Sequence, residues 1–472
     1  MTKKISAILM VLLITGCAAV GPNYVSPTVS APDQWSSEPR GGLSGENPDI
    51  SELAGWWSIL NDPILTNLIE RASRDNLGLL EAVSRIREAR AVVGINRAGL
   101  FPSITGGGDR SYSRSSGQTG SGERADFYST GFDAAWELDI FGGVRRSVEA
   151  AVAELEASEA DLHDVLVILV SEVALNYINV RTLQARISVS ESNLEKQQDT
   201  YELVLARFEA GLTSRLDLEE ATSNLESTHA QIPPLRVEIE QAKNRIAVLL
   251  GDRPGALDDV LSQPEPIPVI PLEVAVGVPA DALRRRPDIR RAERRVAAQT
   301  ARIGVATADL YPRFQLPGSI GLESLSLDTL FRGGSYTYRY GPNFSVPVFT
   351  AGSIRQNIVV QDALAEQALL QYETTILTAL EEVENALVAY ADEQVRRQAL
   401  LNASEAAARA AELAEMQYAA GLIDFQIVLD AQRSLLAFEE QLARSEGEVV
   451  SNLIRLYRAL GGGWMPLVST EG

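Results

Sequence analysis

The chain contains a single cysteine, Cys17, and only two histidines, His163 and His229, among 472 residues. One cysteine excludes a disulfide within the chain, so stability must come from packing. Both histidines lie in segments with helical patterns and have no partner at metal-ligand spacing. No phosphate-binding motif of the Walker type is present. These absences argue against an enzyme, and we expect no catalytic residue, no metal and no cofactor.

Positive charge is also scarce, with 42 Lys and Arg against 63 Asp and Glu, a net charge of −21 and a pI of about 4.7. Nucleic-acid binding needs a basic surface, so we expect no nucleic-acid partner. Long apolar runs are missing too, because the run from Ile5 to Ile14 is too short to span a bilayer as a helix. No later run is expected to span one, so any membrane-spanning part would have to be a β-barrel.

The N-terminus has the features of a bacterial lipoprotein leader. Lys3 and Lys4 precede the apolar run, which ends in Ile14-Thr15-Gly16-Cys17. Small residues before a cysteine predict cleavage after residue 16 and a covalent lipid on Cys17, which anchors a protein without spanning the membrane. Alanine rather than aspartate at position 18 indicates sorting to the outer membrane. The alternative is an ordinary signal peptide with an incidental cysteine.

The rest of the chain contains an internal repeat, in which one long sequence unit occurs twice. Leu100-Phe101-Pro102 returns as Leu310-Tyr311-Pro312, an offset of 210 residues, and Ala210-Gly211-Leu212 returns at the same offset. A repeat of this length indicates a large structural unit used twice. The predicted organisation is a signal peptide (1–16), a lipid-anchored segment (17–70), a first repeat (71–251), a Pro-rich linker (252–280), a second repeat (281–461) and a tail (462–472).

Each repeat predicts a helix, two strands around a Gly/Ser-rich loop, a very long helix, a tight turn and a return helix. Residues 147–210 contain neither proline nor glycine, and at 1.5 Å per residue they form roughly 95 Å of helix. The turns fall at Gly211 and Gly421, and glycine also follows the return helices. Pro233-Pro234 should break or kink the first return helix, whereas the second has no such break.

The strand segments alternate strictly. Tyr128, Phe132 and Trp136 share one face, and Asp133, Glu137 and Asp139 share the other. This pattern is typical of a transmembrane barrel with a wet interior, so these three carboxylates are predicted to line the lumen. A soluble half-buried sheet is the alternative. Four strands per chain cannot close a barrel, so the barrel must be shared, and three chains would supply twelve strands.

Taken together the chain resembles the TolC family of outer-membrane factors, in its lipoprotein branch associated with resistance-nodulation-division pumps. The resemblance also rests on Trp56-Trp57, Asn61-Asp62-Pro63 and the stretch 279–289. It implies a mainly α fold with a transmembrane β-barrel and long helical hairpins that form a periplasmic tunnel. It implies a homotrimer in the outer membrane that works with a periplasmic adaptor and an inner-membrane pump to export small molecules. Alternatives are a duct for type I protein secretion and a lipid-anchored periplasmic coiled-coil scaffold.

The resemblance also implies site residues. The aperture gate would be an acidic ring at Asp430 with Gln426 one turn away, although Ile427 stands where some members carry a second carboxylate. An aperture latch would pair Tyr418 with Asp217. The exposed turns would contact the adaptor through Gly211, Leu212, Thr213, Ser214, Arg215, Gly421, Leu422, Ile423 and Asp424. The run Arg284-Arg285-Arg286 is interpreted as a solvated turn and assigned no site.

Overall fold

A computed structural model describes residues 19–28, 32–46, 49–120, 122–270 and 273–464. The predicted leader and the proposed lipidation site Cys17 lie outside these residues. The chain divides into two compact units, which are described separately. The first takes in 1–28, 84–159 and 290–374, and the second takes in 29–83, 160–289 and 375–472.

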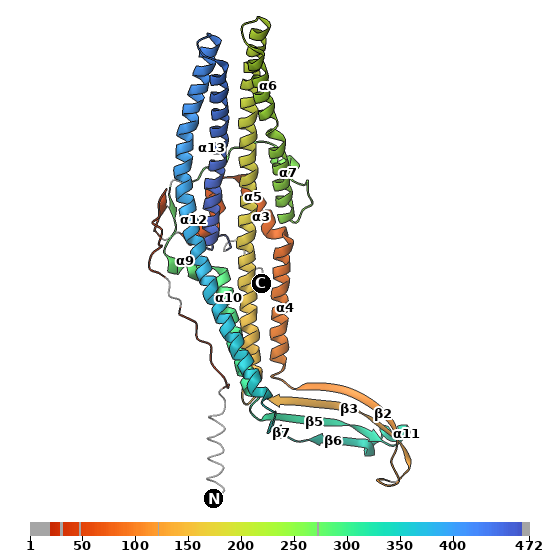
Figure 1. Ribbon diagram of the computed structural model, residues 1–472. Coiled ribbons are helices and arrows are strands. Elements are labelled where there is room, and N and C mark those ends of the chain that lie inside the picture. The colour runs from red at the N-terminus through yellow and green to blue at the C-terminus, as the bar shows by residue number, and fades with distance from the viewer. Residues whose placement is uncertain (1–18, 29–31, 47–48, 121, 271–272, 465–472) are drawn as a thin grey trace. The chain divides into compact units, whose positions relative to one another are not determined.

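The first unit contains an antiparallel sheet in the order β2 (Ser103–Arg114), β3 (Arg124–Leu138), β5 (Arg313–Ser324) and β6 (Tyr336–Tyr340) (Figure 1). The short β7 (Asn343–Ser345) also pairs with β5. Both keep one register along β5, through Gly318↔Tyr340 and Gln315↔Asn343. They are therefore two parts of one strand, interrupted at Pro342, which lacks a backbone donor. The prediction of four strands per chain is confirmed.

Strand register gives the sheet one aromatic and one polar face. Trp136 pairs with Leu316, Phe132 with Ile320 and Ile320 with Tyr338, so these side chains share a face. Their neighbours alternate to the other face, which carries Thr105, Asp109, Ser129, Asp133, Glu137, Gln315, Ser319, Glu323, Thr337 and Arg339. Both faces are largely accessible within the chain. The alternation read from the sequence is therefore the alternation of the folded sheet.

Four helices contribute residues to both units: α4 (Leu77–Ala98), α5 (Gly143–Glu209), α10 (Pro287–Ala308) and α12 (Ser353–Ala419). In the first unit, Ala153 of α5 packs on Ala297 and Ala298 of α10, with Tyr24 beside them. Alanines allow the two helices to lie close together. The short α11 (Leu327–Leu330) and the 3-10 helix η2 (Gly333–Ser335) connect β5 to β6.

The second unit has the larger core, in which Trp56, Leu65, Val173, Tyr177 and Ile454 are almost fully buried. The N-terminal part supplies α2 (Ile50–Ala54), η1 (Trp56–Leu60) and α3 (Pro63–Asp75), whose first turn is capped by the Asp62 side chain. A parallel pair joins β1 (Leu43–Ser44) to β4 (Val274–Ala275). The remaining helices are α6 (Arg215–His229), α7 (Ile232–Leu249), α8 (Asp258–Leu261), α9 (Pro279–Arg285) and α13 (Phe425–Ala459).

The predicted helix ends are confirmed. Gly211 and Gly421 follow the two long helices at φ values of 72° and 74°, a left-handed conformation that glycine adopts without strain. The first return helix is broken between His229 and Ile232, immediately before Pro233, whereas α13 is continuous over 35 residues. The hairpin of α5 and α6 thus differs in shape from the hairpin of α12 and α13 (Figure 1).

The expectation that no run after the leader is apolar enough to cross a membrane is wrong for α5. By length and composition this helix passes such a test, and it is the one that does so in the described part of the chain. However, 61% of its apolar stretch is buried inside the protein. Val170 and Val173 of this helix pack in the core of the second unit. The apolar character of α5 is therefore explained by core packing.

Candidate functional site

The polar face of the sheet carries charges in rows set by the strand register. Asp133 pairs with Thr105 on one side and Ser319 on the other, and Ser319 pairs with Arg339. A shallow hollow of about 410 Å³ lies along this face and is bordered by Asp109, Asp133, Glu323 and Arg339. Glu137 lies one row further along, opposite Gln315. Asp133 and Glu137 thus lie on the face that the sequence assigns to a wet interior.

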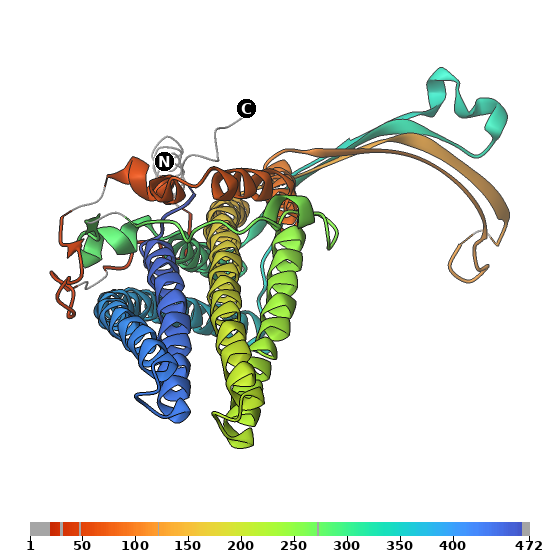
Figure 2. The same cartoon turned by 90° about the horizontal axis from the view of Figure 1, so that it is seen from above.

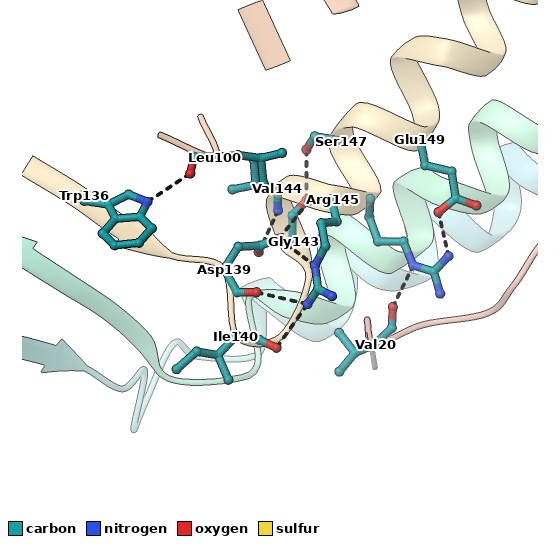
Figure 3. Close-up of polar contacts among 11 residues, drawn as sticks. Val20, Leu100, Trp136, Asp139, Ile140, Gly143, Val144, Arg145, Ser147 and Glu149 are labelled. Atoms are coloured by element: carbon teal, nitrogen blue, oxygen red, sulfur yellow. Dashed lines mark hydrogen bonds and ion pairs between the residues drawn. The ribbon is translucent and has the colours of Figure 1, made fainter. Parts of the chain in front are cut away.

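The prediction that Asp139 lines this face is wrong, because β3 ends at Leu138. The Asp139 carboxylate accepts hydrogen bonds from the backbone amides of Val144 (3.0 Å) and Arg145 (2.9 Å), at the start of α5 (Figure 3). Its Oδ2 also lies 3.2 Å from Nε of Arg145, and its side chain is only 11% exposed. A carboxylate on the free amides at a helix N-terminus stabilises that helix. Asp139 therefore connects the end of β3 to the start of α5 through these hydrogen bonds.

A row of glycines crosses the sheet and was missed from the sequence. Gly107 pairs with Gly131, which pairs with Gly321. A Cβ atom on Gly131 would lie 2.5 Å from the carbonyl oxygen of Ile320, and one on Gly321 would lie 2.5 Å from that of Thr130. The sheet is curved (Figure 2), and glycine in a strand marks a close approach between neighbouring backbones. Only the glycine clusters in the two strand segments could have indicated it.

The N-terminal segment 19–28 is attached to the helices of the first unit. The Val20 amide donates to the Phe141 carbonyl (3.0 Å). The Val20 carbonyl, labelled in Figure 3, accepts from Nε of the buried Arg146 (3.1 Å). Nη2 of Arg146 also donates to Oδ1 of Asn23 (2.7 Å). Gly21 lies against Gly304, where a Cβ would come within 2.4 Å of the Gly304 Cα. The chain immediately after the predicted lipidation site is therefore held next to the end of the sheet.

Glu293 is the second attachment point of this segment. It accepts hydrogen bonds from Tyr24 Oη (2.8 Å), Ser26 Oγ (2.9 Å) and Nη2 of Arg294 (2.7 Å). Partial burial tends to raise the pKa of Glu293, but the bonds from Tyr24, Arg294 and Ser26 outweigh it and leave the pKa lowered. Burial and the bond to Glu293 raise the pKa of Tyr24 to about 12. The attachment therefore depends on an ionised Glu293.

This dependence predicts acid release of the segment. A carboxylate with a lowered folded-state pKa stabilises the bound segment above its ordinary pKa, and the contribution is lost as the pH falls through the lowered value. We expect proteolysis within residues 19–28 to accelerate below about pH 4. In Glu293→Gln, cleavage should already be fast at pH 7 and should vary little with pH. Equal rates for the two proteins at pH 7 would contradict this role of Glu293.

The predicted gate residues lie on an exposed face of α13. Gln426 and Asp430 are both exposed, and Nε2 of Gln426 donates to Oδ1 of Asp430 (3.1 Å). Ile427 beside them is 51% exposed. The expected spacing of one helical turn is therefore present in the folded helix. Nothing else in the described part of this chain covers the two side chains.

The predicted adaptor-contact residues form the two hairpin turns of the second unit. Leu212 and Leu422, at equivalent turns of the two repeats, are 69% and 73% exposed. Gly211, Ser214, Arg215, Gly421 and Asp424 are also exposed, whereas Thr213 and Ile423 are partly buried. Exposed apolar side chains with a polar rim mark interaction surfaces.

The predicted pairing of Tyr418 with Asp217 is wrong within this chain. Asp217 forms a capping box with Ser214 at the start of α6 and also accepts from the Thr213 hydroxyl. Tyr418 is buried, and its hydroxyl has no hydrogen-bond partner among the described residues. The physical reason is local, because Asp217 stands where free amide groups of α6 need an acceptor.

Arg207 contacts Tyr418 instead. Its guanidinium lies 4.7 Å from the centre of the Tyr418 ring, and its Nη1 donates to the Tyr418 carbonyl (2.8 Å). Arg207 is the basic residue in the last turn of α5, which is the signal that could have identified it. The sequence analysis did not select it.

Arg286 was also misinterpreted, because it is buried rather than solvated. Its Nη2 lies 2.8 Å from Asp288 Oδ2 and 2.6 Å from Glu382 Oε2, and its Nη1 donates to the Ala459 carbonyl (2.7 Å). One side chain thereby joins the start of α10 to α12 and to the end of α13. Arg284 is 79% exposed, as interpreted. In the described part of the chain, no group of three or more His, Cys, Asp or Glu could hold a metal ion.

Comparisons with known proteins agree with this architecture. The family model "Outer membrane efflux protein" matches residues 68–252 and again 278–462. Nodulation protein T of Rhizobium leguminosarum bv. trifolii is 34% identical over 457 residues, covering 97% of this chain and 96% of that protein. The solvent efflux pump outer membrane protein SrpC of Pseudomonas putida is 31% identical over 461 residues, covering 96% and 97%.

Solved structures give the same result. The outer-membrane channel OprN superposes with a TM-score of 0.90 at 36% identity, covering 95% of this chain and all of that one. The MtrE channel of Neisseria gonorrhoeae gives a TM-score of 0.82 at 29% identity, covering 95% and 99%. The fold is that of a TolC-like outer-membrane channel. The chain belongs to the outer membrane efflux protein family and functions as the outer-membrane channel component of an efflux system.

Proposed function

We propose that three copies of this chain form a passive duct that carries small organic molecules from a periplasmic adaptor and an inner-membrane pump across the outer membrane. The observation that carries the proposal is the sheet. It has an aromatic face, a polar face and two edges, β2 and β6 with β7, that pair with no strand in the described residues. An apolar face toward lipid and a polar face toward water suit a barrel wall. Free edges need further strands.

Three copies would close that sheet with twelve strands, above the minimum of about eight. The long helices support the same assembly. Leu370, Leu377, Val388 and Val395 of α12 are 54%, 67%, 42% and 70% exposed. Apolar side chains recurring along one long helix favour packing against another helix. We assign this surface of α12 to the contact with the neighbouring copy.

The finer assignments follow from the geometry of the two units. A lipid on Cys17 would precede the attached segment 19–28 by two positions in the sequence. The exposed hairpin turns with Leu212 and Leu422 are the surface offered to the adaptor. Asp133 and Glu137 would line the lumen. A pump of the resistance-nodulation-division type is proposed as the energy source, because relatives are named as the outer membrane proteins of efflux pumps.

The cargo class is proposed from the relatives. Their names specify toluene, solvent and antibiotic efflux, which favours small organic molecules over secreted proteins. The scaffold alternative leaves the aromatic face of the sheet without a function. A strain lacking this chain should become sensitive to toluene and to antibiotics, and expression of the chain should restore resistance. If deletion in a strain without redundant ducts leaves the sensitivity to toluene and antibiotics unchanged, small organic molecules of this class are not the cargo.

Reconstitution tests the duct directly. The purified protein should migrate as a heat-modifiable trimer from outer membranes and should produce discrete conductance steps in a planar lipid bilayer. A monomer absent from the outer-membrane fraction would reject the barrel and support the scaffold. A trimer that stays silent with and without its adaptor would reject the conduit.

The gate is proposed to be a ring of three Asp430 carboxylates. Close like charges attract cations, so the wild-type channel should be blocked by divalent cations. In Asp430→Ala we expect the concentration for half block to rise about tenfold, which corresponds to about 1.4 kcal/mol of binding free energy. Glu219→Ala, an exposed change on α6, is the matched control and should leave the block unchanged. An unaltered block in Asp430→Ala would place the constriction elsewhere.

A further inference from the structure

Three arginines lie on the aromatic face of the sheet, near the turn between β2 and β3. Arg110 pairs with Tyr128, and Arg114 pairs with Arg124 at the last position of this ladder. Because side chains alternate along each strand, the three arginines share the face that carries Phe132. All three are exposed. We call Arg110, Arg114 and Arg124 the arginine patch.

The positive charge of the arginine patch is only partly balanced. Nε and Nη2 of Arg110 donate to Oδ1 of Asp126, at 3.3 and 3.0 Å. Nε of Arg114 donates to the Gly122 carbonyl (3.0 Å), which carries no net charge. Among the described residues, Arg110 is the one member of the patch that has a carboxylate partner, and the Arg124 side chain has no hydrogen bond or ion pair. The patch therefore keeps two unbalanced cations.

The arrangement of Arg114 opposite Arg124 is unfavourable within the chain itself. Directly opposite side chains of an antiparallel pair have Cβ atoms about 5 Å apart, and like charges there destabilise the sheet. An anion bound between the two guanidinium groups removes this repulsion. A guanidinium group can donate two parallel hydrogen bonds to a phosphate, so a phosphate group is the anion that suits the pair. The whole chain has a net charge of −21 and offers anions no general attraction.

We propose that the arginine patch binds the phosphate groups of the glycolipid that forms the outer leaflet of the outer membrane. The proposal rests on the duct proposed above, in which the aromatic face meets lipid. β2 follows α4 and β3 precedes α5, so the turn between the two strands lies at the end of the sheet away from these helices. In the proposed duct the helices are periplasmic, and the arginine patch therefore reaches the outer leaflet.

The depth of the patch fits a lipid headgroup. From Trp136 to Tyr128 on the aromatic face, β3 extends roughly 27 Å at 3.4 Å per residue. With a tilt of about 40°, this length crosses roughly 20 Å of membrane, close to the apolar band of an outer-membrane barrel, which aromatic side chains flank on both sides. Arg110 lies level with Tyr128, and Arg114 and Arg124 lie beyond it. Basic residues at this level attract anionic headgroups.

Binding of purified lipid A to the detergent-solubilised trimer tests the proposal. Lipid A with two phosphates is the probe, and the same lipid without phosphates is the comparison. In the double variant Arg114→Gln with Arg124→Gln, we expect the dissociation constant of the phosphorylated probe to rise about tenfold. The phosphate-free lipid should bind the variant and the wild type equally. Lysine at both positions keeps the charge but not the paired hydrogen bonds, so its effect should be smaller.

Arg339→Gln is the matched control. Arg339 is an exposed arginine on the polar face of the same sheet, so its loss removes one charge without touching the face proposed to meet lipid. The dissociation constant of the probe should stay at the wild-type value. Equal binding of the probe by the double glutamine variant and the wild type would overturn the inference. Equal binding of phosphorylated and phosphate-free lipid A by the wild type would overturn it as well.

Conductance separates this inference from the duct on which it rests. The double glutamine variant should conduct like the wild type, because the arginine patch faces away from the lumen. A conducting trimer that does not distinguish the two forms of lipid A would reject the lipid site and leave the duct intact. A silent wild-type trimer, with weaker binding of the probe in the double variant, would support the lipid site and count against the duct.

Discussion

Gly131→Ala should abolish the assembled outer-membrane form of this protein. The added Cβ would lie 2.5 Å from the Ile320 carbonyl oxygen and 2.7 Å from the Gly321 Cα. Backbone atoms of a paired strand cannot move away without breaking the β3–β5 ladder, which forms the centre of the sheet. We expect heat-modifiable trimers to disappear from outer membranes and resistance to fall to the level of a strain without the protein.

Gly107→Ala is the matched control for this result. Gly107 pairs with Gly131 in the same row, but a Cβ there would have no heavy atom within 4 Å. Its alanine variant should assemble like the wild type, because the substitution is ordinary for an exposed strand position. Normal assembly of Gly131→Ala would show that the strands can separate locally. Failure of both variants would indicate that the row needs flexibility rather than space.

Arg286→Met is expected to have the second-largest effect, on stability. Loss of the guanidinium leaves Asp288 and Glu382 without their cation and the Ala459 carbonyl without its donor. Breaking a buried ion pair by removing one partner destabilises a protein by about 3–5 kcal/mol. The melting temperature followed by helical circular dichroism should fall accordingly, since α10, α12 and α13 all lose this contact.

Arg284→Met serves as the comparison in that experiment. Arg284 is 79% exposed and reaches Asp281 at 3.4 Å, and exposed pairs of this kind contribute about 0–1 kcal/mol. Its melting temperature should stay close to that of the wild type. Equal melting temperatures for the two variants would mean that water replaces the Arg286 contacts without loss.

Features governed by neighbours in the chain could be predicted from the sequence. The turns at Gly211 and Gly421, the break before Pro233 and the length of α5 depend on backbone freedom and on local hydrogen bonding. The two faces of the sheet follow from the strict period of two along each strand. The exposed pair of Gln426 and Asp430 follows from helical spacing alone.

Features that depend on which residues meet across elements could not be predicted in this way. The sequence assigned Asp139 to the lumen and Asp217 to the latch. In the folded protein both carboxylates instead accept hydrogen bonds from groups at the starts of α5 and α6. Arg286 sits in a run of three arginines that looks uniform in sequence. Only packing against α12 and α13 separates it from exposed Arg284.

The sequence by itself determined the internal repeat, the long helical hairpins and the alternation of side chains along the strands. Each of these features depends on a periodic pattern or a turn within one segment of the chain. The tertiary structure decided the glycine row at Gly131, the buried network of Arg286 and the contact of Arg207 with Tyr418. The residues of each contact lie about 100 to 210 positions apart in the sequence, less than half of the 472-residue chain. Close approach and burial set their energies, and neither is encoded in the spacing of residues along one segment.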